Sequence, residues 1–344
     1  MIDTISRHPD FMNSSLERVF AGDPFGFTDV GSVGGAHPLI LPVASRTRCT
    51  CFEPDPASHT ALAEFYAGKS PFADLVIHDC ALAEKDEMRR LHVTKSAVNT
   101  SLLEPDPAFA SRYGVAGLAV THTMDIRTRS LDGALARDRK EKGHVAELIK
   151  LDCQGVEYDI LLGAEEILNR ECVALICESE FAEMYRGQRT FSEVDLFLRK
   201  KGFVLYGLEP HFVSARNLDR RLCETEERLL WVDALYFKDP FAQRKGNGGE
   251  PAREVASLFL AALISRHYAF AMEILDGFAW SRKDREHLGS LIKHCAEEQR
   301  RQLERDTDRL LGDLAASPDR KYLIAKKFID AHRSNSNIDF LTVS

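Results

Sequence analysis

Acidic residues close four apolar runs of the sequence, and this spacing could gather carboxylates around one ligand. Glu53 follows RCTCF, Asp79 follows LVIH, Asp152 follows ELIKL and Glu178 follows CVALIC. Short apolar runs predict strands covered on both faces, and parallel strands end at one edge of a sheet, where ligands bind. A carboxylate at that edge could hydrogen-bond a ribose, take a proton from a hydroxyl or bind a cation.

A glycine-rich segment, FGFTDVGSVGGAHP (25–38), includes the first apolar run and the loop that follows it. Asp29 lies near the end of that run, and Gly31, Ser32 and Gly34 come soon after it. Glycines allow a ligand to approach the backbone, and the next helix offers unpaired N–H groups. A tight turn between strand and helix, with no ligand, would explain the same pattern.

The acids after the second and third runs indicate which ligand the loop would hold. Glu53 lies about 20 residues beyond the glycines, where a carboxylate can accept hydrogen bonds from both hydroxyls of a ribose. Asp79 is placed to accept one from an adenine amino group. The loop reads D-x-G-x-x-G and lacks G-x-G-x-x-G, which favours S-adenosylmethionine over a dinucleotide. Taken singly, each acid is better explained as a solvated carboxylate at a strand end.

Asp152 and Glu178 are the candidate catalytic residues, because adjacent parallel strands would bring both to the same edge of the sheet. There they would face the methyl group of a bound S-adenosylmethionine. A hydroxyl is a poor nucleophile at neutral pH, and a positioned base contributes roughly 10²–10⁴-fold in rate. Asp152 could be that base, or Asp152 and Glu178 could bind Mg²⁺, or both could be purely structural. Glu157 would support the following loop, and Lys150 would pair with one of the acids.

Other polar side chains could contribute to the reaction. His122, His144 and His211 could each deprotonate a hydroxyl, and nothing in their spacing selects one of them. Tyr185 and Arg186 follow the fifth apolar run, where they could stack on a sugar and hydrogen-bond it. A solvated loop is the simpler explanation of these two residues.

Strand-like runs alternate with helix-like stretches between residues 26 and 240. We expect strands at 26–30, 48–54, 73–82, 147–152, 172–179, 202–208 and 233–239. We expect helices at 56–68, 130–140, 158–170 and 190–202. This alternation predicts a doubly wound α/β sheet. The segment 83–146 is too long for a plain connection, so we expect it to line or cover a site.

A cluster of glycines and a proline in FKDPFAQRKGNGGEPARE (237–254) predicts a boundary. We expect a ligand-binding domain over 1–245 and a helical C-terminal extension over 251–344. The extension includes an apolar stretch (254–275) and an amphipathic one (287–314). It could pack on the core or on a second subunit, which would make a homo-oligomer.

Composition narrows the function classes. The chain has 344 residues, a formal net charge of −8 and no basic run, which argues against a dedicated nucleic-acid binder without excluding one. We expect no membrane span and no signal peptide, since long apolar segments are missing from the sequence. Eight cysteines without a C-x-x-C pair predict reduced thiols in a cytoplasmic protein.

Six segments together resemble the FkbM-type methyltransferases, in the order that this family shows, over about residues 26–240. They are TDVGSVGG, CFEPDPASHTALAEF, DCALAEKD, NTSLLEP, SLDGAL and IKLDCQGVEYDILLGAEEIL. The last is the most specific, because family members carry K-x-D-x-E-G-x-E there. The resemblance implies a Rossmann-like class I methyltransferase fold with a mostly parallel seven-stranded sheet. It also implies methyl transfer from S-adenosyl-L-methionine to hydroxyls of sugars and polyketides.

The resemblance also implies which residues hold the cofactor. Gly31 and Gly34 would lie against its methionine part, Glu53 on the ribose and Asp79 near the adenine. The complete expected set is Asp29, Gly31, Ser32, Gly34, Glu53, Pro54, Asp79, Cys80, Ala81 and Ser101. Thr100 and Ser101 would bring hydroxyls near the cofactor or the acceptor, although a surface turn explains them as well.

Two departures from the family pattern bear on the chemistry. Ser32 and Val33 replace the usual Ala-Asn of the first loop, and Gln154 replaces a Glu. We nevertheless expect an S-adenosylmethionine-dependent O-methyltransferase that acts on a hydroxyl of a sugar, glycan precursor or small natural product. The alternatives are a non-catalytic relative that acts as an assembly module through its helical tail, and a nicotinamide oxidoreductase.

Overall fold

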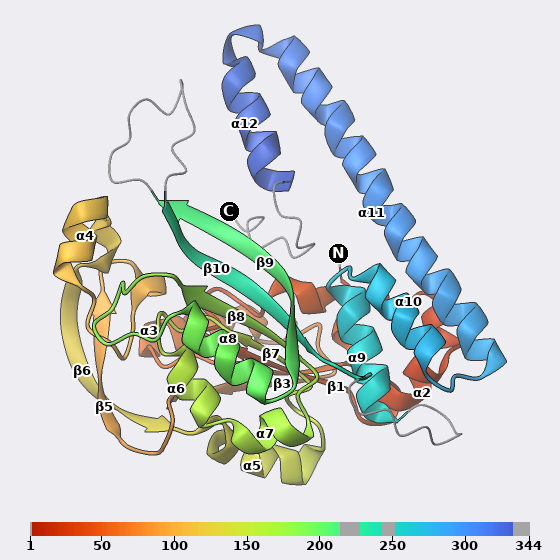
Figure 1. Cartoon of the computed structure of the whole chain (residues 1–344), viewed down its shortest axis with the longest axis horizontal. Coiled ribbons are helices and arrows are strands. Elements are labelled where there is room, and N and C mark those ends of the chain that lie inside the picture. The colour runs from red at the N-terminus through yellow and green to blue at the C-terminus, as the bar shows by residue number, and fades with distance from the viewer. Residues whose placement is uncertain (1, 214–227, 242–251, 333–344) are drawn as a thin grey trace.

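The computed structural model describes residues 2–213, 228–241 and 252–332 and shows a seven-stranded sheet between layers of helices (Figure 1). The strand order is β3-β2-β1-β7-β8-β10-β9. The strands are β1 (Phe25–Val30), β2 (Thr47–Phe52), β3 (Asp74–His78), β7 (Leu148–Leu151), β8 (Ala174–Glu180), β9 (Phe203–Val213) and β10 (Arg228–Lys238). β10 pairs antiparallel with both of its neighbours, β8 and β9, and the other pairs in this sheet are parallel. The predicted doubly wound, mostly parallel sheet is therefore confirmed.

A second sheet of three strands lies in the long segment after β3. It consists of β4 (Ala81–Leu82), β5 (Met88–Thr94) and β6 (Val120–Arg129) in the order β4-β6-β5. The single strand predicted at 73–82 is therefore wrong, because the chain leaves the large sheet after His78 and enters the small one at Ala81. This segment also holds α4 (Pro107–Tyr113) and the short 3₁₀ helices η2 (Ala97–Asn99) and η3 (Ala116–Leu118).

One layer of helices packs on the side of the sheet that faces the viewer in Figure 1. It comprises α5 (Leu131–Lys142), α6 (Glu157–Leu162), α7 (Glu165–Arg170) and α8 (Phe191–Lys200). Thr190 and Glu193 form a capping box at the start of α8, which satisfies two free N–H groups. The helix predicted at 158–170 is interrupted at Gly163, where a Cβ would meet the carbonyl oxygen of Ala83 at 2.5 Å. Because Gly163 has no side chain, its backbone can approach the backbone of Ala83.

The opposite layer combines the N-terminal helices with part of the C-terminal region. It contains α1 (Pro9–Met12), α2 (Ser15–Gly22), the 3₁₀ helix η1 (Pro38–Arg46), α3 (Pro56–Tyr66), α9 (Arg253–Ile264) and α10 (Tyr268–Gly277). Residues 256–264 of α9 are all buried, as expected for a helix that is apolar on every side. The apolar stretch predicted at 254–275 thus forms two helices in the main core.

The rest of the C-terminal region extends away from the sheet. The long helix α11 (Arg282–Ala316) packs only by its first turns, and α12 (Lys321–His332) folds back beside it after the 3₁₀ helix η4 (Pro318–Arg320), as Figure 1 shows. The predicted helical region is confirmed. The boundary positions 245 and 251 lie outside the described residues.

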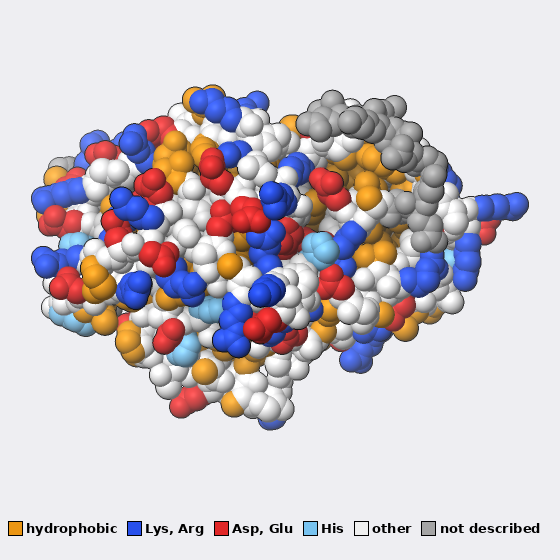
Figure 2. Space-filling view, turned by 90° about the horizontal axis from the view of Figure 1, so that it is seen from below, with side chains coloured by type: hydrophobic (Ala, Val, Ile, Leu, Met, Phe, Trp, Pro, Cys, Tyr) orange, Lys and Arg blue, Asp and Glu red, His pale blue; other side chains and the backbone are white. Residues whose placement is uncertain are grey.

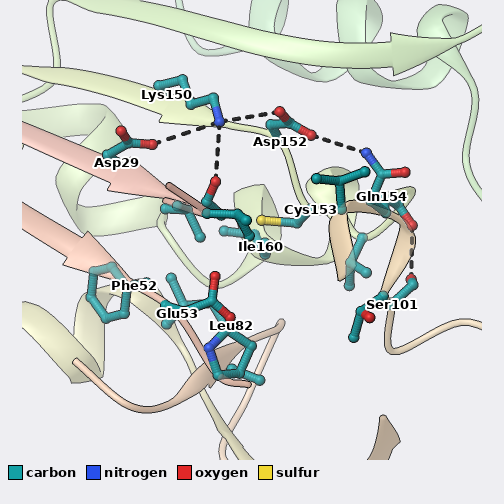
Figure 3. Close-up of a pocket in the computed structure, with 18 of the residues that line it drawn as sticks. Asp29, Phe52, Glu53, Leu82, Ser101, Lys150, Asp152, Cys153, Gln154 and Ile160 are labelled. Atoms are coloured by element: carbon teal, nitrogen blue, oxygen red, sulfur yellow. Dashed lines mark hydrogen bonds and ion pairs between the residues drawn. The ribbon is translucent and has the colours of Figure 1, made fainter. Parts of the chain in front are cut away.

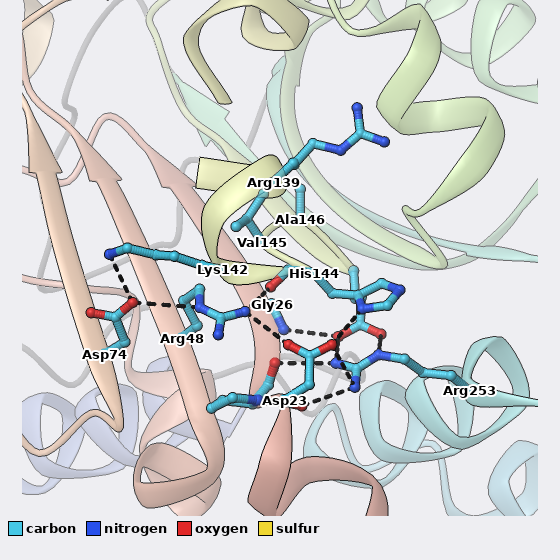
Figure 4. A network of polar contacts seen from close by, with 12 residues as sticks. Asp23, Gly26, Arg48, Asp74, Arg139, Lys142, His144, Val145, Ala146 and Arg253 are labelled. Atoms are coloured by element: carbon cyan, nitrogen blue, oxygen red, sulfur yellow. Dashed lines mark hydrogen bonds and ion pairs between the residues drawn. The ribbon is translucent and has the colours of Figure 1, made fainter. Parts of the chain in front are cut away.

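A partly buried network of ion pairs connects α9 to the amino-terminal edge of the sheet (Figure 4). Arg253 donates two hydrogen bonds of 2.8 Å to the carboxylate of Glu147, which also accepts one from the backbone N–H of Gly26. Oδ2 of Asp23 lies 3.1 Å from Nη1 of Arg253 and 2.6 Å from Nδ1 of His144. Because Glu147 is 2% exposed, this pairing offsets the cost of burying its charge.

The surface of the described residues carries charges of both signs. Figure 2 shows basic and acidic side chains interspersed over the face seen from below in Figure 1. This face therefore offers no broad basic area of the kind that attracts a polyanion. Within the described part of the chain, no helix combines the length and apolarity that crossing a bilayer requires.

Candidate active site

A cavity of about 290 Å³ opens at the carboxyl ends of β1, β2 and β7 (Figure 3). Of the residues expected around a cofactor, it is lined by Asp29, Gly31, Gly34, Glu53, Pro54, Cys80, Ala81 and Ser101. The long segment after β3 also borders the cavity, which is lined by Ala97, Val98, Thr100, Ser101 and Leu102. Ser32 and Asp79 are not among the lining residues.

The glycine loop after β1 is shaped by close contact with the loop after β7. Gly31 has φ +84°, and a Cβ at this position would collide with the carbonyl oxygen of Asp152. Gly34 has the same φ but faces open space. Ser32 is 1% exposed and donates its hydroxyl to the carbonyl oxygen of Asp29 at 2.8 Å, so it fixes the turn from behind the cavity.

Lys150 forms the electrostatic centre of the cavity floor. Its Nζ lies 3.2 Å from Oδ2 of Asp152 and 3.7 Å from Oδ1 of Asp29. Burial by itself would lower the pKa of Lys150. The two carboxylates raise this pKa by more than burial lowers it, so the ammonium stays charged. Asp29 is fully buried, which raises its pKa, while Lys150 and the N–H of His37, which donates at 2.7 Å, act in the opposite direction.

Glu53 is held at the cavity wall by the start of α3. Its Oε1 accepts a hydrogen bond of 2.9 Å from the N–H of Asp55, which in turn caps the helix at Ser58. Glu53 is only 3% exposed, and burial raises its pKa to about 7. The carboxylate lacks solvation, so hydroxyl donors of a ligand would stabilise its charged form.

Asp79 differs from most of the other candidates in that it does not line the cavity. It follows β3 by one residue, is exposed, and does not line the cavity, whereas the next residues, Cys80 and Ala81, do. The chain turns toward the small sheet at this point. The structure therefore brings Gly31 and Glu53 to one cavity without Asp79.

Asp152 and Glu178 are joined by the side-chain amide of Gln154 (Figure 3 shows its contact with Asp152). The amide nitrogen of Gln154 donates to Oδ1 of Asp152 at 3.1 Å and to Oε1 of Glu178 at 2.9 Å. Asp152 lines the cavity, and Glu178 is not among the lining residues. Burial and the nearby carboxylate of Asp152 raise the pKa of Glu178 well above its usual value.

These two carboxylates do not fit Mg²⁺ in the observed arrangement. The amide that bonds both presents N–H groups where a cation would need oxygen ligands. Within the described ranges, no group of three or more His, Cys, Asp or Glu side chains is placed to hold a metal ion.

Neighbouring segments hold the loop of Gln154 in place. Ser101 donates its hydroxyl to the carbonyl oxygen of Gln154 at 2.8 Å, and Glu157 accepts the N–H of Cys153. The hydroxyl of Tyr185 lies 2.9 Å from Oε1 of Gln154. Tyr185 is fully buried, so the sugar-stacking interpretation of this residue is wrong. Arg186 is exposed and pairs with Glu104 at 3.0 Å.

The three candidate histidines separate in space. His144 belongs to the network at the opposite edge of the sheet, and His122 lies on the exposed strand β6. His211 on β9 is near the expected edge: its Nε2 lies 2.8 Å from Oδ2 of Asp233, and Asp233 is the cross-strand neighbour of Glu178. Its ring stacks on Trp231 at 4.8 Å. Sequence spacing could not reveal this pair, which depends on strand register.

The sheet order, with one antiparallel strand near its edge, and a cavity over the carboxyl ends of its central strands define a class I methyltransferase fold. The family model described as "Methyltransferase FkbM domain" matches residues 32–205. The chain therefore belongs to the FkbM methyltransferase family, and this membership supports S-adenosylmethionine as its cofactor.

Solved structures with similarity to this chain are distant. The FkbM methyltransferase from Methylobacillus flagellatus KT has 16% identity and a TM-score of 0.34 over 62% of this chain, which spans only 44% of that structure. Sp1610 from Streptococcus pneumoniae, proposed to be a tRNA (m1A22) methyltransferase, has 12% identity and a TM-score of 0.32, covering 82% of this chain and 96% of that one. No curated protein sequence matches this chain at a significant level.

Proposed function

We propose that this protein is an S-adenosylmethionine-dependent O-methyltransferase acting on a hydroxyl of a sugar, glycan precursor or small natural product. The observation that carries the proposal is the position of Asp152. Its carboxylate lines the same cavity as the glycine loop and Glu53. A proton acceptor thus stands beside the surface expected to hold the cofactor.

Each part of the cavity has a task in this proposal. Glu53 accepts hydrogen bonds from the ribose, and Gly31 and Gly34 leave room for the methionine end. The bound cofactor supplies an electrophilic methyl group on a sulfonium. Asp152 would take the proton from the acceptor hydroxyl as the acceptor oxygen bonds to the methyl carbon that the sulfur releases. Positioning and exclusion of water supply most of the remaining acceleration.

Two measurements test this function. Calorimetry should show micromolar-range binding of S-adenosylhomocysteine, and labelled cofactor with a panel of nucleotide sugars and hydroxylated small molecules should reveal the acceptor. Asp152→Asn should bind S-adenosylhomocysteine as the wild type does but lower turnover by roughly 10²–10⁴-fold. Asp125→Asn, on the exposed face of β6, is the matched control and should retain full turnover. Unchanged turnover in Asp152→Asn would remove Asp152 from the mechanism.

A second candidate function, an assembly module, draws on the helices that extend from the body. Leu303, Leu311 and Ile329 on α11 and α12 are 48–60% exposed, and such residues could pair with a second copy. Deleting residues 301–344 leaves the buried part of α11 in place, unlike a cut at the predicted boundary. A lower number of subunits per particle, with full cofactor binding, would support self-association through these helices. An unchanged number of subunits would exclude it.

The proposed location is the cytoplasm. All seven cysteines within the described residues are free thiols, and four of them are buried. Free thiols persist in a reducing compartment, and the remaining Cys223 lies outside the described residues.

A further inference from the structure

The side chain of Gln154 has a partner for each of its polar atoms. Its amide nitrogen donates to Asp152 and Glu178, and its amide oxygen accepts from the hydroxyl of Tyr185 at 2.9 Å. A primary amide has two N–H donors on one side and one carbonyl oxygen on the other. Two carboxylate oxygens and one hydroxyl donor therefore match an amide in this orientation.

The backbone at Gln154 is held in an unusual conformation. Its φ is +58°, a left-handed value that costs a side chain other than Gly, Asn or Asp of the order of 1 kcal/mol. The adjacent Gly155 also has a positive φ of +93°. Such strain persists where surrounding contacts over-determine the conformation, and here the carbonyl oxygen of Gln154 is fixed by Ser101. The loop is thus built to present the amide between the two acids.

The bridging geometry differs from that of a metal bridge. The two N–H bonds of an amide diverge by about 120°, so acceptors at ~3 Å from the nitrogen lie about 5 Å apart. Mg²⁺ at ~2.1 Å from each of two oxygens requires a separation of no more than about 4.2 Å. The amide is also neutral, so it leaves Lys150 as the cation in contact with Asp152.

We propose that Gln154 replaces a divalent cation as the bridge between Asp152 and Glu178, which makes it a positioning residue for metal-free chemistry. In this role it fixes Oδ1 of Asp152 while Lys150 fixes Oδ2. Asp152 then works as a base rather than as a metal ligand. The inference about catalysis rests on the proposed methyl transfer, but the cation-excluding role of Gln154 can be measured without any acceptor.

The test uses Mn²⁺ as the probe and electron paramagnetic resonance to count the free ion. The wild type should bind no Mn²⁺ beyond what Glu178→Gln binds. Gln154→Glu replaces the amide nitrogen with an oxygen and adds a third carboxylate, so it should bind one Mn²⁺ per chain at least about tenfold more tightly than the wild type. Gln302→Glu makes the same charge change beside Asp306 on the surface of α11 and should not reach that affinity.

Two results would overturn the inference. One is a Mn²⁺ ion bound to the wild type that Glu178→Gln loses. The other is a Gln154→Glu variant that keeps the wild-type circular dichroism and affinity for S-adenosylhomocysteine yet gains no Mn²⁺ binding. A wild type that fails to bind S-adenosylhomocysteine would contradict the proposed function instead, because that measurement does not depend on Mn²⁺.

Discussion

Glu53 should contribute oppositely to stability and to cofactor binding, and Glu53→Gln separates the two effects. Its carboxyl is 3% exposed, and burial raises its pKa from 4.5 to about 7. Between these two values the folded protein holds a proton that the unfolded chain releases. The contribution of Glu53 to stability without cofactor is therefore fully present below pH 4.5 and is lost as the pH rises through 7.

The size of this effect follows from the two pKa values. The interval of about 2.5 pH units, at about 1.4 kcal/mol each, corresponds to about 3.5 kcal/mol. Glutamine has nearly the same shape and never ionises. Glu53→Gln should therefore raise the free energy of unfolding by up to about 3.5 kcal/mol at pH 8 and leave it nearly unchanged at pH 4.

Cofactor binding should change in the other direction. A carboxylate can accept from both ribose hydroxyls, whereas an amide offers one acceptor oxygen, and a hydrogen bond to a charged group contributes about 1.5–3 kcal/mol. Glu53→Gln should weaken S-adenosylhomocysteine binding by about 10- to 150-fold at pH 8.

Urea unfolding at pH 4 and pH 8, together with calorimetry, measures both effects. Glu64→Gln on the exposed side of α3 is the control and should change stability by less than about 0.5 kcal/mol. If Glu53→Gln lowered stability at pH 8 and kept full affinity, both the burial argument and the ribose assignment would be refuted.

Two further predictions compare matched variants. Gly31→Ala should abolish S-adenosylhomocysteine binding and destabilise the fold by more than Gly34→Ala. Both positions need a positive φ, which costs an alanine roughly 1–2 kcal/mol, but only the Cβ at position 31 collides with a carbonyl oxygen. Equal urea midpoints of the two variants would disprove this. Arg253→Met should cost about 3–5 kcal/mol in urea unfolding by leaving Glu147 buried and unpaired, whereas Arg282→Met, at a 93% exposed side chain, should cost less than about 0.5 kcal/mol. A small loss in Arg253→Met would mean that apolar packing and the hydrogen bond from Ser257 to Glu147 hold α9 without the ion pair.

The large sheet could be predicted because its strands carry their own signal. Runs such as GFTDV and ELIKLD are buried on both faces, and the observed strands Phe25–Val30 and Leu148–Leu151 lie within a residue or two of the predicted ones. The small sheet has no such signal. Its strand β6 is largely exposed and mixes charged with apolar residues, so its pairing with β5 cannot be read from an apolar run.

The candidate site likewise contains residues whose position could be predicted from the sequence and residues whose position could not. The glycine loop and Glu53 could be placed because each directly follows a strand of the sheet. Asp79 has an equivalent place in the sequence, but the chain turns away after β3 and leaves it exposed. The direction of a side chain beyond a strand end depends on where the chain goes next, and residue spacing carries no information about that.

The sequence alone determined the layered α/β sheet, because local hydrophobicity marks its strands. The resemblance of six segments indicated the family, and the residues that end each strand indicated the chemistry expected at the carboxyl edge. Only the tertiary structure decided that the amide of Gln154 meets Tyr185, 31 residues away, and Glu178, 24 residues away. Such contacts depend on strand register and on how distant segments pack: a shift of one residue in β8 would turn Glu178 to the opposite face of the sheet.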